Sequence, residues 1–361
     1  MRAGSAPHFP VEDRVARFRS FYRRENERPL LGFFAGSEYP LRRYRASDSL
    51  PSDRPLVPED FTIGPYLDDC DRLSALHEAC GGDFIWSASA FWGIPWLEAA
   101  LGCPVFADHA TGSIHAGLPA SFSGPESVPA FDDGSPWMRL AAEFLDCMAG
   151  RGRGRWPVGT TRMRGIADLL SALYGGTEFI LAMIERPGEV KEVCRKLTEF
   201  WIAFGKFQLA RIPLFHGGVG SFYYNLWTPP GTVWHQEDAA ALLSPAFYDE
   251  FIREHDDRIA RAFDGCIMHQ HPTKFVPTDF YLRMPFLALE LHIDEGGPRA
   301  EALHQAHLRI LEAKPLVIWG DIPGPDLDWI FRKLPSAGLA VITVVSSPEQ
   351  AGEVWRRCFL S

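Results

Sequence analysis

The sequence predicts an α/β protein built as a single (β/α)8 barrel of the TIM type. Apolar, strand-like runs alternate with amphipathic, helix-like stretches along most of the 361 residues, which is the pattern of repeated βα units. Several strand-like runs are apolar on both faces, as in parallel sheets that helices cover on both sides. No Gly-x-Gly-x-x-Gly turn follows a predicted strand, which weighs against an open dinucleotide-binding sheet. A closed barrel is therefore favoured.

Residues 1–361 are predicted to form one domain, in which residues 1–28 are a helical extension before the barrel. Residues 11–26 have the pattern of an amphipathic helix with a basic face. The eight predicted strands are short and mostly apolar, and they cover residues 29–36, 87–92, 157–163, 214–222, 265–269, 286–292, 315–320 and 339–345. The predicted helices cover residues 68–80, 95–101, 136–149, 166–174, 177–185, 187–211, 245–263, 299–313, 327–334 and 348–357.

Helix ends and loops follow from local signals. Gly102 ends the short helix at 95–101, and Pro187 opens the longest helix at its first position, where a missing N–H costs nothing. Residues 103–135 are rich in Gly, Pro and Ser and have no helical period. They are predicted to form an excursion of loops and short strands after the second strand. Residues 223–234 are predicted to form an aromatic loop.

Composition limits the classes of function. The chain is 46% hydrophobic and 23% charged, as expected for a globular protein with a substantial core. Its net charge of −10 argues against nucleic acid or an anionic membrane as the main partner. The seven cysteines are scattered, and no Cys-x-x-Cys pair occurs, so a reducing compartment is expected. Neither a signal-peptide core near the N-terminus nor a bilayer-spanning apolar run is present, so we expect a cytoplasmic protein with a small-molecule substrate.

Two polar runs at predicted strand ends are the most informative feature of the chain. His269 and His271 end the fifth strand, and Glu290, His292 and Asp294 follow the same alternation at the end of the sixth. Alternate side chains of a strand point to one face, so each set projects together. Imidazoles and carboxylates that converge in this way are typical of a divalent metal site or a general acid/base centre.

Other candidate residues lie at the carboxyl ends of strands, where barrels place their active sites. They are Arg162, Arg164, Tyr224, His235, Asp238, Trp319 and Asp321. Each candidate has a structural alternative. The histidines can bond backbone carbonyls, Glu290 can form a salt bridge to an arginine such as Arg162, and Asp238 can sit in a first helical turn. The arginines can serve as ion-pair partners, and the aromatic residues can simply fill space.

Four segments of the sequence carry a resemblance to a known family. They are residues 161–170 (TRMRGIADLL), Glu237-Asp238 with residues 243–251 (LSPAFYDEF), residues 268–271 (MHQH) and residues 319–323 (WGDIP). The chain resembles the uroporphyrinogen decarboxylase superfamily, which includes corrinoid-dependent and thiol methyltransferases, over roughly residues 29–355. MHQH stands in the place of the family's HxCG motif, and WGDIP in that of its GNxDP turn. The resemblance implies a (β/α)8 barrel, in agreement with the pattern of elements.

Departures from the family pattern narrow the activity. The haem-pathway decarboxylase has an arginine-rich MRQAGRY segment and a GHG turn, whereas this chain has GFFAGSEY at residues 32–39 and no GHG. The zinc methyltransferase branch uses HxC and a later Cys to hold the metal. Here His271 stands at the first Cys position, and no Cys occurs near Val345-Ser346-Ser347.

The leading hypothesis is a metal-dependent methyltransferase or demethylase. His269, His271 and Glu290 would hold Zn²⁺, or Fe²⁺, and Asp238 or His292 would move a proton. Residues for substrate binding would be Arg162, Arg164, Tyr224, His235, Trp319 and Asp321. A corrinoid would be presented by a partner protein, because the chain has no cobalamin-binding DxHxxG motif.

Two other hypotheses stay open. In the first, the protein is a cofactor-free decarboxylase or another lyase, in which Arg162 and Arg164 hold carboxylates and Asp238 stabilises a cationic intermediate. In the second, it is a ligand-binding barrel without catalytic activity. A homodimer is also expected from the resemblance, since related barrels often dimerise.

Overall fold

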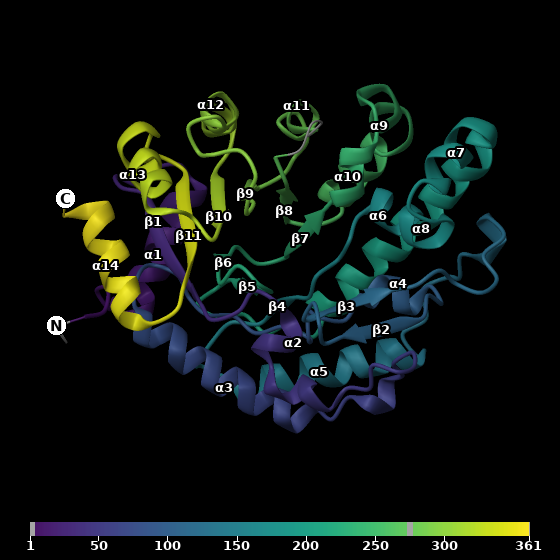
Figure 1. The fold of residues 1–361 in the computed structure, drawn as a ribbon, viewed down its shortest axis with the longest axis horizontal. Helices are drawn as coiled ribbons and strands as arrows, with labels where there is room; N and C mark the ends of the chain where they lie inside the picture. The colour runs from purple at the N-terminus through teal and green to yellow at the C-terminus, as the bar shows by residue number, and fades with distance from the viewer. Residues whose placement is uncertain (1–3, 273–276, 361) are drawn as a thin grey trace.

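The computed structural model describes residues 4–272 and 277–360, so residues 1–3 and 361 of the predicted domain lie outside it. Its centre is a parallel sheet of six strands, which follow one another along an arc in Figure 1. In spatial order the strands are β1 (Leu30–Ala35), β11 (Leu339–Val345), β10 (Leu316–Gly320), β9 (Ala288–Ile293), β8 (Gly265–Gln270) and β7 (Thr232–Gln236). Nearly every residue in them is buried, which explains why their sequences are apolar on both faces.

The remaining strands are shorter than predicted. A second sheet consists of β4 (Gly159–Thr160), β5 (Val219–Ser221) and β6 (Trp227–Thr228). The predicted strand at 87–92 contributes a single bridge, between Ala88 and Val158. Another isolated bridge joins Arg164 to Gln236 of β7. The described residues thus have a TIM-like α/β arrangement. Among them, however, no single sheet of eight strands is found, and the sheet does not close into a barrel.

The structure corrects the prediction of a loop at residues 223–234. Strand β7 begins at Thr232 and pairs in parallel with β8, from Thr232 opposite Gly265 to Gln236 opposite His269. All five residues of β7 are buried, including the polar His235 and Gln236. Polar and apolar residues do not alternate along this strand, because both of its faces are buried. The sequence pattern therefore did not predict it as a strand.

Fourteen α-helices occur among the described residues. They are α1 (Val11–Tyr22), α2 (Pro40–Arg43), α3 (Ile63–Cys80), α4 (Trp96–Ala100), α5 (Pro136–Gly152), α6 (Ile166–Tyr174), α7 (Glu178–Glu185), α8 (Pro187–Leu209), α9 (Pro245–Phe251), α10 (Arg253–Arg261), α11 (Thr278–Tyr281), α12 (His304–Ala313), α13 (Gly324–Lys333) and α14 (Pro348–Phe359). The helix predicted at 245–263 is two helices, α9 and α10, with a break at Ile252.

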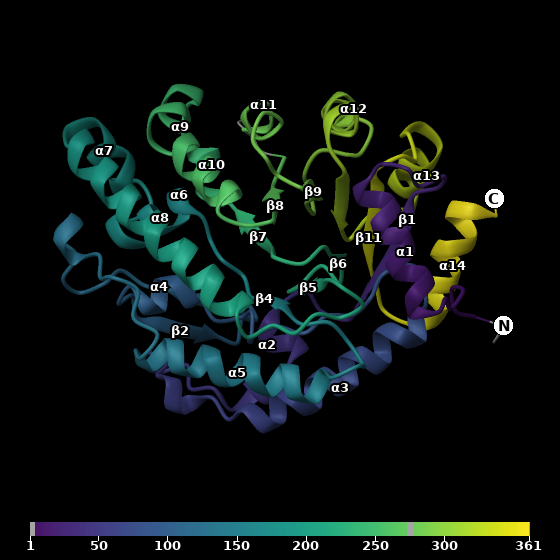
Figure 2. The same cartoon turned by 180° about the vertical axis from the view of Figure 1, so that it is seen from behind.

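The helices lie on both sides of the strands. Figures 1 and 2 show α9 to α13 outside the arc of the six-stranded sheet, while α3 and α5 run along the opposite edge of the molecule. The first and last helices, α1 and α14, lie close to one another in both views. Within the described ranges no single helix is long and apolar enough to cross a bilayer, and the one pair that reaches this length together, α6 with α7, is bent by 98°.

The predicted excursion at 103–135 contains an antiparallel hairpin of β2 (Val105–Asp108) and β3 (Ser113–Ala116). Its turn needs Gly112, whose φ of 83° is a left-handed conformation that side chains disfavour. The Leu41 N–H donates to the Gly112 carbonyl at 2.9 Å, so the hairpin tip is tied to α2. The excursion therefore folds back toward the carboxyl end of β1.

Strand register brings the polar runs together. His269 of β8 lies opposite Glu290 of β9, and His292 of β9 lies opposite Trp319 of β10. On the other side of β8, His269 lies opposite Gln236 of β7. Parallel strands end at the same edge of a sheet, so these pairings place the ends of four strands around one point. That edge is where barrels of this kind have their active sites.

Candidate metal centre

Three histidines converge at the carboxyl ends of β8 and β9. The Nε2 atoms of His269 and His271 are 3.0 Å apart. The His292 ring lies beside both, with its centre 5.7 Å from that of His269 and 4.8 Å from that of His271. Each histidine offers one nitrogen within 4.8 Å of the others. The convergence predicted from alternation is therefore present, and it includes His292.

A carboxylate lies behind each of the two facing imidazoles. Glu290 bonds Nδ1 of His269, and Asp294 bonds Nδ1 of His271 at 2.7 Å. A carboxylate only accepts, so each Nδ1 carries the proton, and the Nε2 atom of a neutral ring is left with a lone pair. Two lone pairs at 3.0 Å repel one another unless a proton or a metal ion lies between them. Histidine ligands of metals commonly have such a carboxylate behind them.

Asp238 adds an oxygen to the same point. One of its carboxylate oxygens, Oδ2, accepts from Nε2 of Gln236 at 2.8 Å. The other, Oδ1, is buried and has no hydrogen-bond partner among the described residues. It lies 3.7 Å from Nε2 of His269 and 3.9 Å from Nε2 of His271. The two Nε2 atoms, between which a proton or a metal ion must lie, and one free carboxylate oxygen thus face one another.

The pKa values show how this cluster holds its charge. Burial lowers the pKa of His271, but the bond to Asp294 and the charges of Asp238 and Asp294 outweigh burial and raise it to about 9. Burial raises the pKa of Glu290, yet the charge and hydrogen bond of His269 bring it below its usual value. The pKa of Asp294 is likewise lowered, because the bond to His271 outweighs burial. The two carboxylates are therefore ionised, and positive charge on the histidine side balances them.

The cluster forms one wall of a cavity of about 290 Å³. Acidic, basic and aromatic side chains all contribute to its surface. The lining residues are Glu38, Tyr39, Pro40, Trp92, Ser113, Arg162, Phe222, Tyr223, Tyr224, Gln236, Asp238, His269, His271 and His292. A concave site of this size, with several convergent polar groups, suits a small ligand.

Two of the predicted substrate-binding residues line this cavity. The Tyr224 hydroxyl lies 3.0 Å from Nδ1 of His269, and the tyrosine ring stacks on Trp234. Arg162 forms no ion pair with any described residue, and its Nε atom is buried without a partner. Burial lowers the pKa of Arg162. A partly buried guanidinium without an ion pair is costly, and among the described residues Arg162 is the arginine of the cavity wall that lacks one.

The other four predicted substrate-binding residues do not line the cavity. Arg164 forms ion pairs with Glu98 at 3.2 Å and Asp168 at 3.3 Å. Trp319 lies flat against His292, with ring centres 4.6 Å apart and planes 29° apart, so it orients that histidine. His235 is buried and bonded to Asp256 at 2.8 Å. Asp321 is exposed.

Behind the cavity, buried carboxylates fix the segment that carries Asp238. Glu237 accepts from the backbone N–H groups of Ile166 and Ala167 at the start of α6, at 2.5 and 2.9 Å. Asp168 accepts from the N–H groups of Asp238 and Ala239 at 3.2 and 2.8 Å. His235, Glu237 and Asp256 also lie close enough to share an ion. Both oxygens of Glu237 are already used by α6, however, so this group is better explained as structural.

Sequence reasoning missed several residues of the cavity, of which Glu38 is the most important. Glu38 follows β1 as His271 follows β8, so the rule that points to strand ends would have found it. Trp92 and Phe222 line the cavity from apolar or aromatic segments. Nothing in the sequence distinguishes such residues from core residues, because they differ only in which side of the segment meets the cavity.

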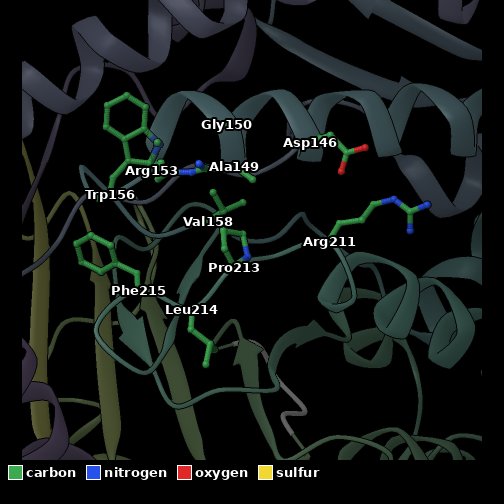
Figure 3. A pocket seen from close by; sticks show the side chains of 12 residues that line it. Asp146, Ala149, Gly150, Arg153, Trp156, Val158, Arg211, Pro213, Leu214 and Phe215 are labelled. Carbon is green, nitrogen blue, oxygen red and sulfur yellow. The ribbon is translucent and has the colours of Figure 1, made fainter.

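A second hollow of about 280 Å³ lies at the opposite end of the strands, beside Val158 and Phe215 just before β4 and β5. Figure 3 shows Trp156 and Phe215 at one side of it and Asp146 and Arg211 at the other. It contains no histidine or cysteine. The chemistry of the chain is therefore concentrated at the histidine end.

Comparisons with known proteins bear on the fold. No protein-family model and no curated protein matches the sequence. Among solved structures, a methyltransferase from Methanosarcina mazei is similar, with a TM-score of 0.62 and 12% sequence identity. The likeness covers 98% of this chain and 100% of that chain. At so low an identity it shows a shared fold, which agrees with the TIM-like arrangement of the strands.

Proposed function

We propose that the protein is a metal-dependent methyltransferase or demethylase that acts on a small substrate. The observation that carries the proposal is the convergence of two imidazole nitrogens, the Nε2 atoms of His269 and His271, with the unpartnered Oδ1 of Asp238. The name of the structural neighbour, a methyltransferase, supports the choice of reaction. The methyl group would be exchanged with a corrinoid that a partner protein presents, since the chain has no cobalamin-binding motif of its own.

The metal ligands would be His269, His271 and His292. This assignment differs from the sequence hypothesis, in which Glu290 was the third ligand. The contact of Glu290 with Nδ1 of His269 favours a positioning role for this carboxylate, because it lies behind the imidazole. His292 has a nitrogen within reach of the other two histidines, and Trp319 holds its ring. Three imidazoles suit Zn²⁺, and also Fe²⁺.

A bound ion of this kind would supply Lewis-acid polarisation of an oxygen, nitrogen or sulfur atom of the substrate. Asp238 would accept the proton that such an atom loses, at the Oδ1 atom that faces the histidines. Gln236 holds the other oxygen of Asp238, so the carboxylate keeps its direction. Tyr224 and Arg162, which also line the cavity, would contact the substrate.

A second candidate function is decarboxylation without a metal. It is favoured by one observation, the unpaired Arg162 in the cavity wall, because a guanidinium binds a carboxylate with two parallel hydrogen bonds. In this case the histidine cluster would hold protons, and Asp238 would stabilise a cationic intermediate. The two candidates differ in their need for metal.

Elemental analysis of the purified protein tests the proposal. We expect about one zinc or iron per chain in the natural protein and its loss in His269→Ala, His271→Ala and His292→Ala. His115→Ala is a matched control, because His115 is exposed on β3 and outside the cavity. Unchanged metal content in the double variant His269→Ala/His271→Ala would contradict the ligand assignment. A protein that neither contains nor takes up metal would support decarboxylation instead.

A further inference from the structure

Two charged side chains of opposite sign stand unpaired in the wall of the cavity. Arg162 and Glu38 both line it, and neither forms a hydrogen bond or ion pair with a described residue. Arg162 lies two residues before Arg164, which forms a bridge with Gln236 of β7. Arg162 thus lies beside β7, the strand that leads to Asp238.

Glu38 lies on the other side of the histidine cluster. Its charge interacts with those of His292, Asp321 and Asp294, and burial raises its pKa. Tyr223 also lines the cavity, and its ring lies against Phe34 of β1 and Trp319 of β10, with ring centres 4.7 and 4.8 Å apart. In the strand order β1-β11-β10-β9-β8-β7, the strands β8 and β9 that carry the histidines lie between β1, which leads to Glu38, and β7, beside which Arg162 lies. The two charges of the cavity wall therefore flank the histidines.

Both charged residues are held by buried contacts, so their separation is built into the fold. Nη1 of Arg43 donates to the carbonyls of Ala35 and Ser37, at 2.7 and 3.3 Å, and so fixes the loop that leads to Glu38. The residue before Arg162, Thr161, is buried and fixed from two sides. Its N–H donates to the side chain of Gln208 at 2.8 Å, and its hydroxyl donates to the Ala90 carbonyl at 3.0 Å.

The surface between the two charges is aromatic. Trp92 contacts Tyr223 with ring centres 5.0 Å apart, and Phe222 contacts Tyr224 at 5.6 Å. Aromatic faces attract organic cations, including methylated ammonium groups, and also cover apolar carbon chains. A partly buried charge loses its hydration without regaining a partner in the protein, so a ligand with the complementary charge gains from both ends of such a cavity.

We propose that the cavity binds a small zwitterion, whose anionic group pairs with Arg162 and whose cationic nitrogen lies against Glu38 and the aromatic wall. This inference rests on the proposed function in taking the cavity as the substrate site and in giving the ligand a methyl group. It names the substrate class that the site selects, an N-methylated amino acid or a similar molecule with two opposite charges. It also assigns Glu38 as a specificity-determining residue.

Calorimetric titration of the metal-containing protein tests this inference. The probes are a series of N-methylated ω-amino acids of increasing length, with acetate and methylammonium as single-charge halves. We expect at least one zwitterion to bind about tenfold or more tightly than either half. The proposal would be overturned if acetate or methylammonium bound as tightly as the best zwitterion, or if no zwitterion in the series showed saturable binding.

Variants identify which end of the ligand each residue holds. Glu38→Gln should weaken the zwitterion about tenfold and leave acetate unchanged, whereas Arg162→Gln should weaken both the zwitterion and acetate. Glu185→Gln and Arg45→Gln make the same changes of charge at exposed positions outside the cavity and should have no effect. Zwitterion binding that is unchanged in Glu38→Gln would contradict the proposal.

Metal content and thermal unfolding are measured on the same samples. Loss of binding with a normal unfolding temperature excludes a folding defect. A protein without metal that still binds the zwitterion contradicts the proposed reaction and supports this inference, and a metal-containing protein without zwitterion binding does the reverse.

Discussion

The two carboxylates behind the histidines give the site its direction. Glu290 and Asp294 each hold the Nδ1 proton of one imidazole, so the Nε2 atoms turn toward the cavity. Without these partners either ring nitrogen could carry the proton, and the lone pairs would not be fixed. Glu290 is fully buried, and its lowered pKa keeps it ionised. Glu290 therefore has a defined role in positioning His269, distinct from that of a metal ligand.

Glu290→Gln separates these two roles. The amide keeps the size of the side chain but removes its charge, so we expect zinc affinity to fall about 10- to 100-fold while binding remains measurable. Competition with a chromophoric chelator measures the change. Complete loss of zinc, equal to that of His269→Ala, would mean that Glu290 is itself a ligand.

Asp238→Asn tests the proton acceptor. Asparagine keeps the shape of the side chain but accepts no proton, so we expect the rate of methyl transfer to fall by a factor of 10² or more. The metal content should remain near that of the natural protein. Loss of the metal together with activity would place Asp238 among the ligands and leave the proton acceptor to be found.

At the scale of residues, the sequence predicts which side chains lie together better than it predicts what each side chain does. The period of two in residues 269–271 and 290–294 was enough to group the histidines with their carboxylates. It could not show which atoms face the cavity, because Glu290 and His292 share one face of β9 and differ only in depth. Arg164 and Arg162 also share a face, yet Glu98 and Asp168 neutralise only Arg164. Asp168 is only four residues from Arg164, but Glu98 comes from α4, whose position relative to Arg164 the local pattern does not contain.

At the scale of elements, the start of α6 connects the scaffold to the site. The backbone N–H groups there bind the carboxylate of Glu237, next to Asp238 in the chain. This approach needs Gly165, because a Cβ atom at that position would lie 2.3 Å from the Gln236 carbonyl oxygen and 2.2 Å from Cδ of Glu237. Burial and the charge of Asp256 raise the pKa of Glu237. The hydrogen bond from the backbone N–H of Ile166, at the start of α6, opposes this shift because it stabilises the ionised carboxylate.

We expect Gly165→Ala to lower the free energy of unfolding by about 1–3 kcal/mol, because the backbone of β7 must move. Zinc affinity should fall as well, since Asp238 moves with Glu237. Chemical denaturation and metal titration measure the two effects. Gly188→Ala is the control, because the space around Gly188 is open, and it should leave both unchanged. Equal stability of the two variants would contradict the close contact.

Strands that are mostly apolar were the elements most readily predicted. The expected strands at β1, β8, β9, β10 and β11 are confirmed, since runs buried on both faces have few alternatives in sequence. The strands that were predicted wrongly are those in which burial of a residue does not follow from its polarity. β7 buries His235 and Gln236 in the sheet, and the segment at 87–92 is buried but makes only one bridge. In both cases tertiary contacts decide the outcome.

At the scale of the molecule, the fold is TIM-like and the likeness to a solved methyltransferase extends over 98% of the chain. The alternation of elements predicted this class. Closure and strand number depend on backbone pairing between distant segments, which composition and period do not contain. The site was accessible to prediction because a parallel α/β arrangement gathers strand ends at one edge, whatever the details of closure.

Acid should weaken the whole fold through a residue that does not line the cavity, His307. His307 of α12 is fully buried, and neither ring nitrogen has a partner among the described residues. Burial and the charge of His304 lower the pKa of His307 to about 4. The unfolded chain therefore binds a proton between pH 6.5 and 4 that the folded chain refuses, and stability is lost as pH falls through this range.

We expect His307→Leu to reduce this acid sensitivity. Between pH 7.5 and 5 the natural protein should lose about 2 kcal/mol more free energy of unfolding than the variant. Urea denaturation at several pH values measures the difference, with His115→Leu as the exposed control. Parallel pH profiles for the natural protein and the variant would show that His307 does not contribute.

The central claim is that the three histidines hold a metal ion. The most direct test is a crystal structure of the zinc-loaded protein with anomalous diffraction at the zinc edge. We predict one peak about 2.0–2.1 Å from Nε2 of His269 and of His271, with His292 as a further ligand and Glu290 still bonded to Nδ1 of His269. A peak elsewhere, or histidines that remain hydrogen-bonded to one another with zinc in excess, would contradict the claim.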